Sequence, residues 1–191
     1  MTQKEINNKA QKVNDISLDY HLTHAVFACD KLLEDSFREA GKKEIARLNN
    51  ALKKAFREKD DDTVAKLIKE RKSLKLVKYH IFVDYVDMDD PEAGRVIKAE
   101  NKLIITLPRK LLDQTRGENG ALVSGGIEKL RKVMAHELGH IMLHTDKLLF
   151  IDNMVGSKQL DGEQEQEADW FAIELLRLRH ERNEKLAKLR N

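Results

Sequence analysis

Apolar positions in the first 75 residues recur with helical spacing. One run starts near Val26 and ends near Gly41, and a second extends from Ile45 to Phe56. A charged stretch over residues 57–62 interrupts the pattern, and an aspartate there can cap a third, shorter helix. We predict an N-terminal helical region over residues 1–75, with its Lys and Glu residues on a solvated face. A helical hairpin that docks a partner is the alternative.

The pattern changes after this region. Residues 76–86 are rich in β-branched and aromatic side chains, which favours a strand. Residues 95–98 and 102–107 predict a hairpin that turns at Asn101, and Pro108 ends its second strand. Residues 109–126 contain a loop rich in Gly, Asn and Ser.

Two helical patterns follow, over residues 127–145 and 162–180. The order of helices, then strands, then helices predicts an α+β fold with a small antiparallel sheet. We expect these strands and helices to form a core over residues 76–191 as one compact unit.

The motif that carries chemistry is His136-Glu137-Leu138-Gly139-His140, an H-E-x-x-H pattern. Residues four apart share a helix face, so both imidazoles can reach one zinc ion. Glu137 can contact a metal-bound water and act as general base. The surrounding segment is apolar on nearly all sides, which predicts a buried helix. A pair of hydrogen-bonded core histidines is the alternative.

The acidic segment that begins at residue 161 supplies candidates for a third ligand. On a helical wheel Glu165 falls with the apolar residues and Asp169 beside them, whereas Glu163 and Glu167 fall on the opposite face. We predict Glu165 as the third ligand in preference to Glu167. Asp169, one turn later, is a candidate to orient a ligand imidazole through a hydrogen bond.

His144 extends the histidine stripe by one more turn. Because a helix rises about 6 Å over four residues, we do not expect three such histidines to share one ion. We interpret His144 as a pocket-wall or structural residue. The chain has one cysteine, Cys29, so the metal ligands must be nitrogen and oxygen atoms. Zinc suits two His and one Glu, and manganese or iron could also occupy this set.

Two blocks of sequence resemble the ImmA/IrrE family of metallo-endopeptidases. The residues from Ala135 to His144 are similar to the pattern A-H-E-L-G-H-x-x-L-H, and those from Glu165 to Leu176 to the pattern E-x-E-A-[ND]-x-F-A-x-x-L-L. The resemblance covers about residues 95–178. One departure is the absence of a proline after the final Leu-Leu, where a basic helical pattern continues.

The resemblance implies a zincin-like core that holds one zinc ion through His136, His140 and Glu165, with Glu137 as base. It also implies a limited cut in a helix-turn-helix repressor of bacteria or phages. Two other functions stay open: a partner-binding protein whose metal site is not catalytic, and a zinc hydrolase of a small amide.

Charge and hydropathy narrow the class of protein further. With 35 basic and 33 acidic residues the net charge is +2, so direct nucleic-acid binding is not expected. The chain shows no apolar signal segment at its start and no run long enough to span a membrane. We therefore expect a cytoplasmic protein, and the resemblance implies that its partner is a protein substrate.

Overall fold

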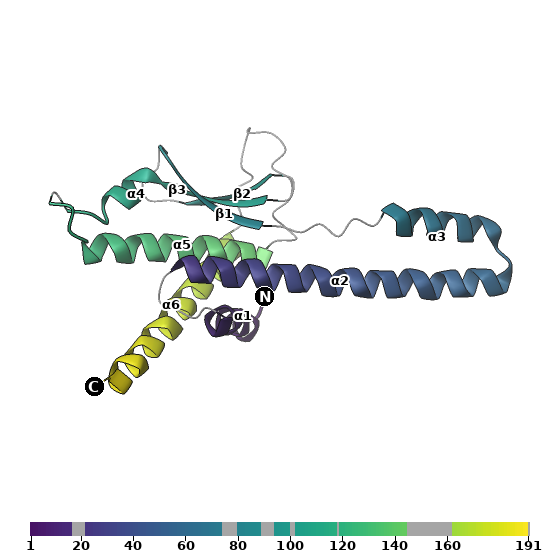
Figure 1. Ribbon diagram of the computed structural model, residues 1–191, viewed down its shortest axis with the longest axis horizontal. Helices are drawn as coiled ribbons and strands as arrows, with labels where there is room; N and C mark the ends of the chain where they lie inside the picture. The colour runs from purple at the N-terminus through teal and green to yellow at the C-terminus, as the bar shows by residue number, and fades with distance from the viewer. Residues whose placement is uncertain are drawn as a thin grey trace. The chain divides into compact units, whose positions relative to one another are not determined.

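The computed structural model divides the chain into two compact units (Figure 1). One unit consists of Met1–Lys31 together with Tyr79–Asn191, and the other of Leu32–Lys78. The structure describes residues 1–16, 22–73, 80–88, 94–99, 102–117, 119–144 and 162–190. The boundary expected between residues 75 and 76 lies outside the described residues.

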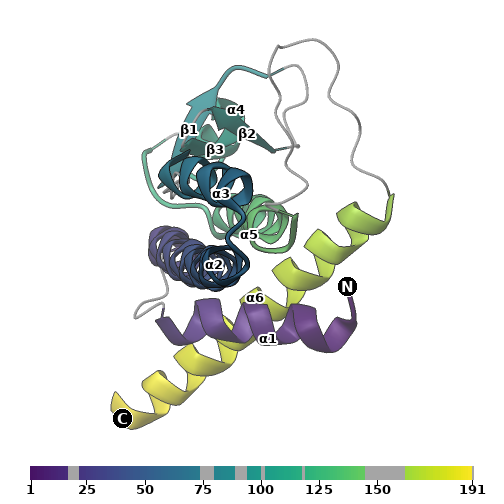
Figure 2. The same cartoon turned by 90° about the vertical axis from the view of Figure 1, so that its right-hand side faces the viewer.

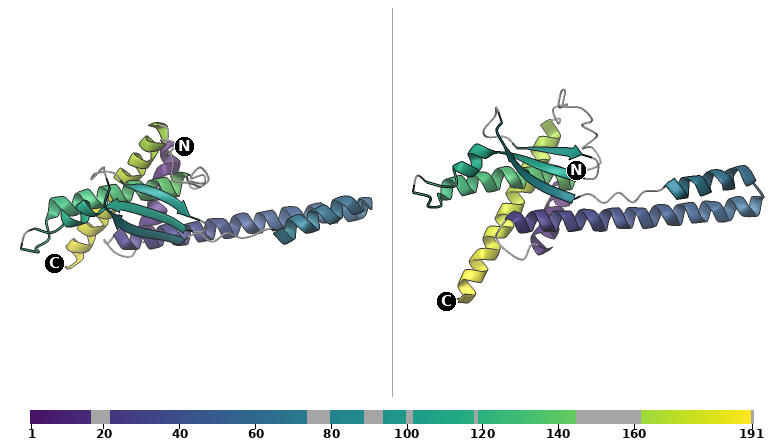
Figure 3. Two further views of the ribbon diagram at one scale, coloured as in Figure 1. Left: turned by 90° about the horizontal axis from the view of Figure 1, so that it is seen from above. Right: turned by 45° about the horizontal axis from the view of Figure 1, so that its top comes forward.

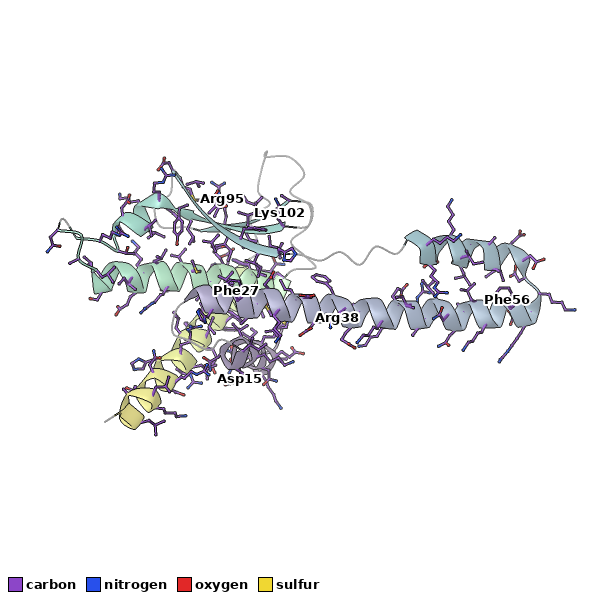
Figure 4. The ribbon with its side chains drawn as sticks, viewed as in Figure 1. Asp15, Phe27, Arg38, Phe56, Arg95 and Lys102 are labelled. Atoms are coloured by element: carbon purple, nitrogen blue, oxygen red, sulfur yellow. The ribbon has the colours of Figure 1, made fainter. Side chains whose placement is uncertain are left out.

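The smaller unit is a helical hairpin. It contains most of α2 (Leu22–Glu58) and all of α3 (Asp61–Ser73). Lys59 adopts a positive φ of 54° at the turn, and Asp60 caps α3 by accepting a hydrogen bond from the Thr63 N–H at 3.0 Å. Phe56, labelled in Figure 4 near the turn, is 60% exposed.

The small core of this hairpin consists of Leu52, Ala55 and Val64, against which Leu67 packs. The predicted helix end near Gly41 is wrong, because α2 continues through this residue as one helix. A single glycine costs roughly 1 kcal/mol relative to alanine inside a helix, which weakens a helix of 37 residues without ending it.

The larger unit contains a three-stranded sheet in the order β1-β3-β2. Its strands are β1 (His80–Val86), β2 (Arg95–Ala99) and β3 (Lys102–Pro108). The predicted hairpin is confirmed, since β2 pairs antiparallel with β3. The sheet as a whole is mixed and not antiparallel as expected, because β1 pairs parallel with the other side of β3. Residues 76–79 of the first predicted strand lie outside the described residues.

In addition to the start of α2 and a short helix described below, this unit contains three helices that pack in sequence against one another. These are α1 (Gln3–Ile16), α5 (Ser124–His144) and α6 (Gly162–Arg190). Figure 3 shows the strands over α5, and both β2 and β3 contact this helix. Helix α6 packs against α5 and also against α1, and the pair α1 and α6 is visible in Figure 2.

A short helix, α4 (Arg109–Asp113), lies within the segment predicted to contain a loop. It follows directly after β3 and buries Leu111 completely. Its five residues are too few for a helical period to show in the sequence.

Helices α5 and α6 approach closely at Gly139. A Cβ atom built at this glycine would lie 2.9 Å from the backbone oxygen of Ala168. The buried apolar residues of the two helices are Met134, Ala135, Leu138, Ile141, Leu143, Ala168, Phe171, Ala172 and Leu175. The predicted α+β class is confirmed, with a small mixed sheet beside a mostly helical body.

None of the described helices combines the length and the apolar character that crossing a membrane requires. Cys29 is fully buried, as its apolar neighbours indicated. Burial raises the pKa of its thiol far above the ordinary value, so this thiol stays protonated at neutral pH.

Candidate metal centre

Helix α5 carries the H-E-x-x-H motif into the interior of the larger unit. Glu137 and His140 are buried, with 3% and 4% of their surfaces exposed, and His136 is half-buried. The burial predicted from the apolar sequence is confirmed from Met134 onward, whereas Ile127, Leu130 and Val133 in the first half of the helix are half-buried. Because a polar group inside a helix bundle needs partners, the surroundings of these three side chains decide their role.

The two motif histidines converge with Glu165 from the first turn of α6. The Nε2 atoms of His136 and His140 are 3.0 Å apart. Glu165 Oε2 lies 3.1 Å from His136 Nε2, and its Oε1 lies 3.5 Å from His140 Nε2. Among the described residues this is the one group of three His, Cys, Asp or Glu side chains arranged to hold a metal ion.

The separations and the donor chemistry of this group fit a zinc ion. In a tetrahedral site with metal–ligand distances of roughly 2.1 Å, neighbouring ligand atoms lie about 3.4 Å apart. Burial, and then the nearby His136 and His144, lower the pKa of His140 to about 3. His140 is therefore neutral at physiological pH, the form in which an imidazole binds metal.

Asp169 contacts the opposite nitrogen of His136. Its Oδ1 lies 2.9 Å from His136 Nδ1, although the carboxylate is 60% exposed. An imidazole that donates from Nδ1 to a carboxylate directs the lone pair of Nε2 toward Glu165 and His140. Asp169 therefore lies in a position to orient the ring of His136, the role for which the sequence made it a candidate.

Glu137 lies beside this cluster in a poorly solvated position. Burial, and then the charge of Glu165, raise the pKa of its carboxyl to about 8. Gly94, just before β2, packs directly against it: a Cβ atom built there would lie 2.7 Å from Glu137 Oε1. Sequence reasoning missed this contact, because an isolated glycine before a strand carries no signal of its partner.

His144 and Glu167 lie apart from the three clustered ligands and contact each other. His144 Nε2 is 2.8 Å from Glu167 Oε2, and the two side chains are only 1% and 4% exposed. Glu167 Oε1 accepts a further hydrogen bond from the amino group of Met1. Burial acts to raise the pKa of Glu167, but the hydrogen bonds from the amino group and His144 outweigh it, so the pKa is lowered.

The expectation that Glu167 faces away from the core is wrong. Glu165 is 47% exposed on its side chain and Glu167 is 4% exposed, the reverse of what the helical wheel indicated. The physical reason is that α6 is covered on two sides, by α5 and by α1. The wheel identified the apolar side of α6, but the carboxylate of Glu167 lies on another side, where it bonds to His144 and to the amino group of Met1.

Comparison with known proteins agrees with this site. The family described as the IrrE N-terminal-like domain, a peptidase family, matches residues 128–186. The matched range includes the H-E-x-x-H motif, Glu165 and Asp169, and covers about a third of the chain. No curated protein and no solved structure matches the chain.

The family match and the His136, His140 and Glu165 cluster together point to a metal-dependent peptide hydrolase. The matched range does not include the sheet or the helical hairpin, whose sequences carry no part of the two motif blocks. Residues 128–186 of the chain are therefore similar to the IrrE N-terminal-like domain, in agreement with the resemblance carried by the two motif blocks.

Proposed function

We propose that this protein is a zinc-dependent endopeptidase that makes limited, site-specific cuts in a protein substrate. The observation that carries the proposal is the convergence of His136, His140 and Glu165 next to the buried carboxyl of Glu137. A site that only stabilised the fold would have no use for an uncoordinated, buried carboxyl beside the ligands.

In this proposal His136, His140 and Glu165 hold the ion, and Asp169 fixes the ring of His136. A bound zinc ion lowers the pKa of water and polarises the scissile carbonyl. The neutral state of His140 and the hydrogen bond of His136 to Asp169 leave both Nε2 lone pairs free for this role.

Glu137 takes the proton of the attacking water and then donates it to the nitrogen of the departing amine. A carboxyl whose ordinary pKa is near 4.5 is a weak base, and the low polarity of its position strengthens it. The positive charge of a bound ion opposes this effect, so that the carboxylate is available near neutral pH.

The substrate backbone requires a strand to pair with. The central strand β3 is not an edge and cannot take this role, since it has β1 on one side and β2 on the other. We propose β2 instead: it is an outer strand, it contacts α5, and Gly94 at its start lies against Glu137. A peptide added along β2 would pass the general base with its backbone extended.

A helix-turn-helix repressor is the substrate that we propose, on the resemblance of the two motif blocks to the ImmA/IrrE family. A peptidase that cuts such a partner once would relieve repression and leave most other proteins intact. Co-expression with the repressors encoded next to its gene tests this proposal directly.

Wild type, Glu137→Gln and Glu128→Gln are compared in that experiment by mass spectrometry of the repressor and by zinc content. Glu128 is an exposed glutamate on the same helix and serves as the matched control. We expect a single cut with wild type and Glu128→Gln, and none with Glu137→Gln at equal zinc content. Cleavage by zinc-loaded Glu137→Gln would exclude the assigned base, and a zinc-loaded wild type that cuts no repressor would favour a binding role.

A further inference from the structure

The buried pair formed by His144 and Glu167 is not used by the proposed reaction. His144 lies one helical turn after His140, with the two ring centroids 5.7 Å apart. Glu167 lies two residues after Glu165 and points toward a different part of α5. Both side chains carry chemistry, both are almost completely excluded from water, and neither belongs to the three-ligand cluster.

Helices α5 and α6 approach closely at Gly139 and Ala168. A Cβ atom built at Gly139 would lie 2.9 Å from the backbone oxygen of Ala168 and 3.0 Å from its Cα. One close contact fixes the distance between two helices but leaves α6 able to swivel about that point. The hydrogen bond from His144 to Glu167 joins the same helices at a second point. Two points of attachment define the orientation of α6, and hence where the carboxylate of Glu165 lies.

We propose that His144 and Glu167 are positioning residues for the metal centre: their buried hydrogen bond holds the first turn of α6 so that Glu165 meets His136 and His140. The proposal rests on the metal site of the proposed function. Groups that orient ligands typically change metal affinity 10–100-fold when they are removed. Glu165 depends on such support, because its own side chain is half-exposed and is not confined by packing.

The alternative is that the pair contributes only to the stability of the fold, as many buried polar pairs do. The two roles differ in one measurable respect. If the pair is purely structural, its removal lowers the stability of the metal-free protein. The apparent zinc affinity then falls only in proportion to the fraction of molecules that remain folded. A positioning pair lowers the zinc affinity of molecules that remain folded.

The test measures zinc affinity of the full chain by competition with a chelating dye, alongside the melting temperature of the metal-free protein. The variants are Glu167→Gln, Glu167→Ala and His144→Gln. The control is Val13→Ala, which removes two fully buried methyl groups from α1, the other helix that covers α6. All measurements are made at a temperature where each variant is folded.

We expect Glu167→Ala to weaken zinc binding about 10–100-fold. Glu167→Gln keeps the volume and an acceptor oxygen, so it should lose less stability and less zinc affinity than Glu167→Ala. Val13→Ala should lower the melting temperature and leave zinc affinity unchanged. Wild-type zinc affinity in folded Glu167→Gln and His144→Gln would overturn the proposal. Tight zinc binding by a wild type that cuts no repressor would instead count against the proposed function alone.

Discussion

The buried carboxyl of Glu137 predicts an unusual dependence of stability on pH in the metal-free protein. Its pKa is about 8 in the folded chain, against an ordinary value of 4.5. At pH values between 4.5 and 8, the Glu137 carboxyl is protonated in the folded state and ionised in the unfolded state. The stabilising contribution of this group is therefore fully present below pH 4.5 and is lost as the pH rises through 8.

The magnitude follows from the size of the shift. Each pKa unit corresponds to about 1.4 kcal/mol, so this one carboxyl lowers the free energy of unfolding by up to about 4 kcal/mol between pH 5 and pH 8. Glu137→Gln removes the titration and keeps the volume. The stability of Glu137→Gln relative to wild type should thus increase with pH, because only wild type must bury a negative charge at pH 8.

Urea unfolding in the presence of a chelator at pH 5, 6.5 and 8 measures this difference, with the fluorescence of the single tryptophan as the probe. The contribution of His140, whose pKa is lowered, is common to both proteins and cancels in the comparison. The exposed Glu128→Gln should show a difference that does not vary with pH. Saturating zinc should bring the wild-type curve closer to that of Glu137→Gln, since a cation nearby favours the carboxylate of Glu137. Parallel stability curves for wild type and Glu137→Gln in chelator would refute the reasoning.

Three further predictions concern the contacts that build the site. Gly139→Ala should destabilise the protein by about 1–3 kcal/mol in thermal or urea unfolding, because the new methyl group meets the Ala168 backbone at 2.9 Å; unchanged stability would show that the helices can separate without cost. Gly94→Ala should reduce kcat at least tenfold while zinc content stays constant, since its Cβ would lie 2.7 Å from Glu137 Oε1; a change in KM alone would argue against displacement of the base. Glu165→Ala should lose zinc on dialysis against a weak chelator, as seen by elemental analysis, and full occupancy would exclude this residue as the third ligand.

Local sequence patterns were sufficient to predict the parts of the fold that depend on local chemistry. The hairpin of β2 and β3 follows from two β-rich runs on either side of Asn101. The buried helix α5 follows from an apolar surface that surrounds the H-E-x-x-H motif. The meeting of this motif with Glu165 and Asp169 also agrees with the helical wheel, since both fall toward α5.

Features that depend on contacts between distant segments could not be predicted in this way. The parallel pairing of β1 with β3 requires a crossover whose path no local pattern encodes. The packing of α1 against α6 in the larger unit is of the same kind, because the helical period of α1 is also typical of an independent helical region.

Glu167 shows most clearly what a single-helix pattern leaves out. An acidic residue near a helix N-terminus is stabilised by the helix dipole in water, and this explanation accounts for Glu163, which is exposed. The same explanation fails for Glu167, whose environment is set by His144 and by α1. A buried carboxylate persists only where hydrogen bonds replace its hydration, and those donors come from segments 23 and 166 residues away in the chain. Residues that position the ligands of a metal centre are therefore harder to predict than the ligands themselves. The ligands follow from residue spacing within helices, whereas the positioning residues depend on how the helices pack.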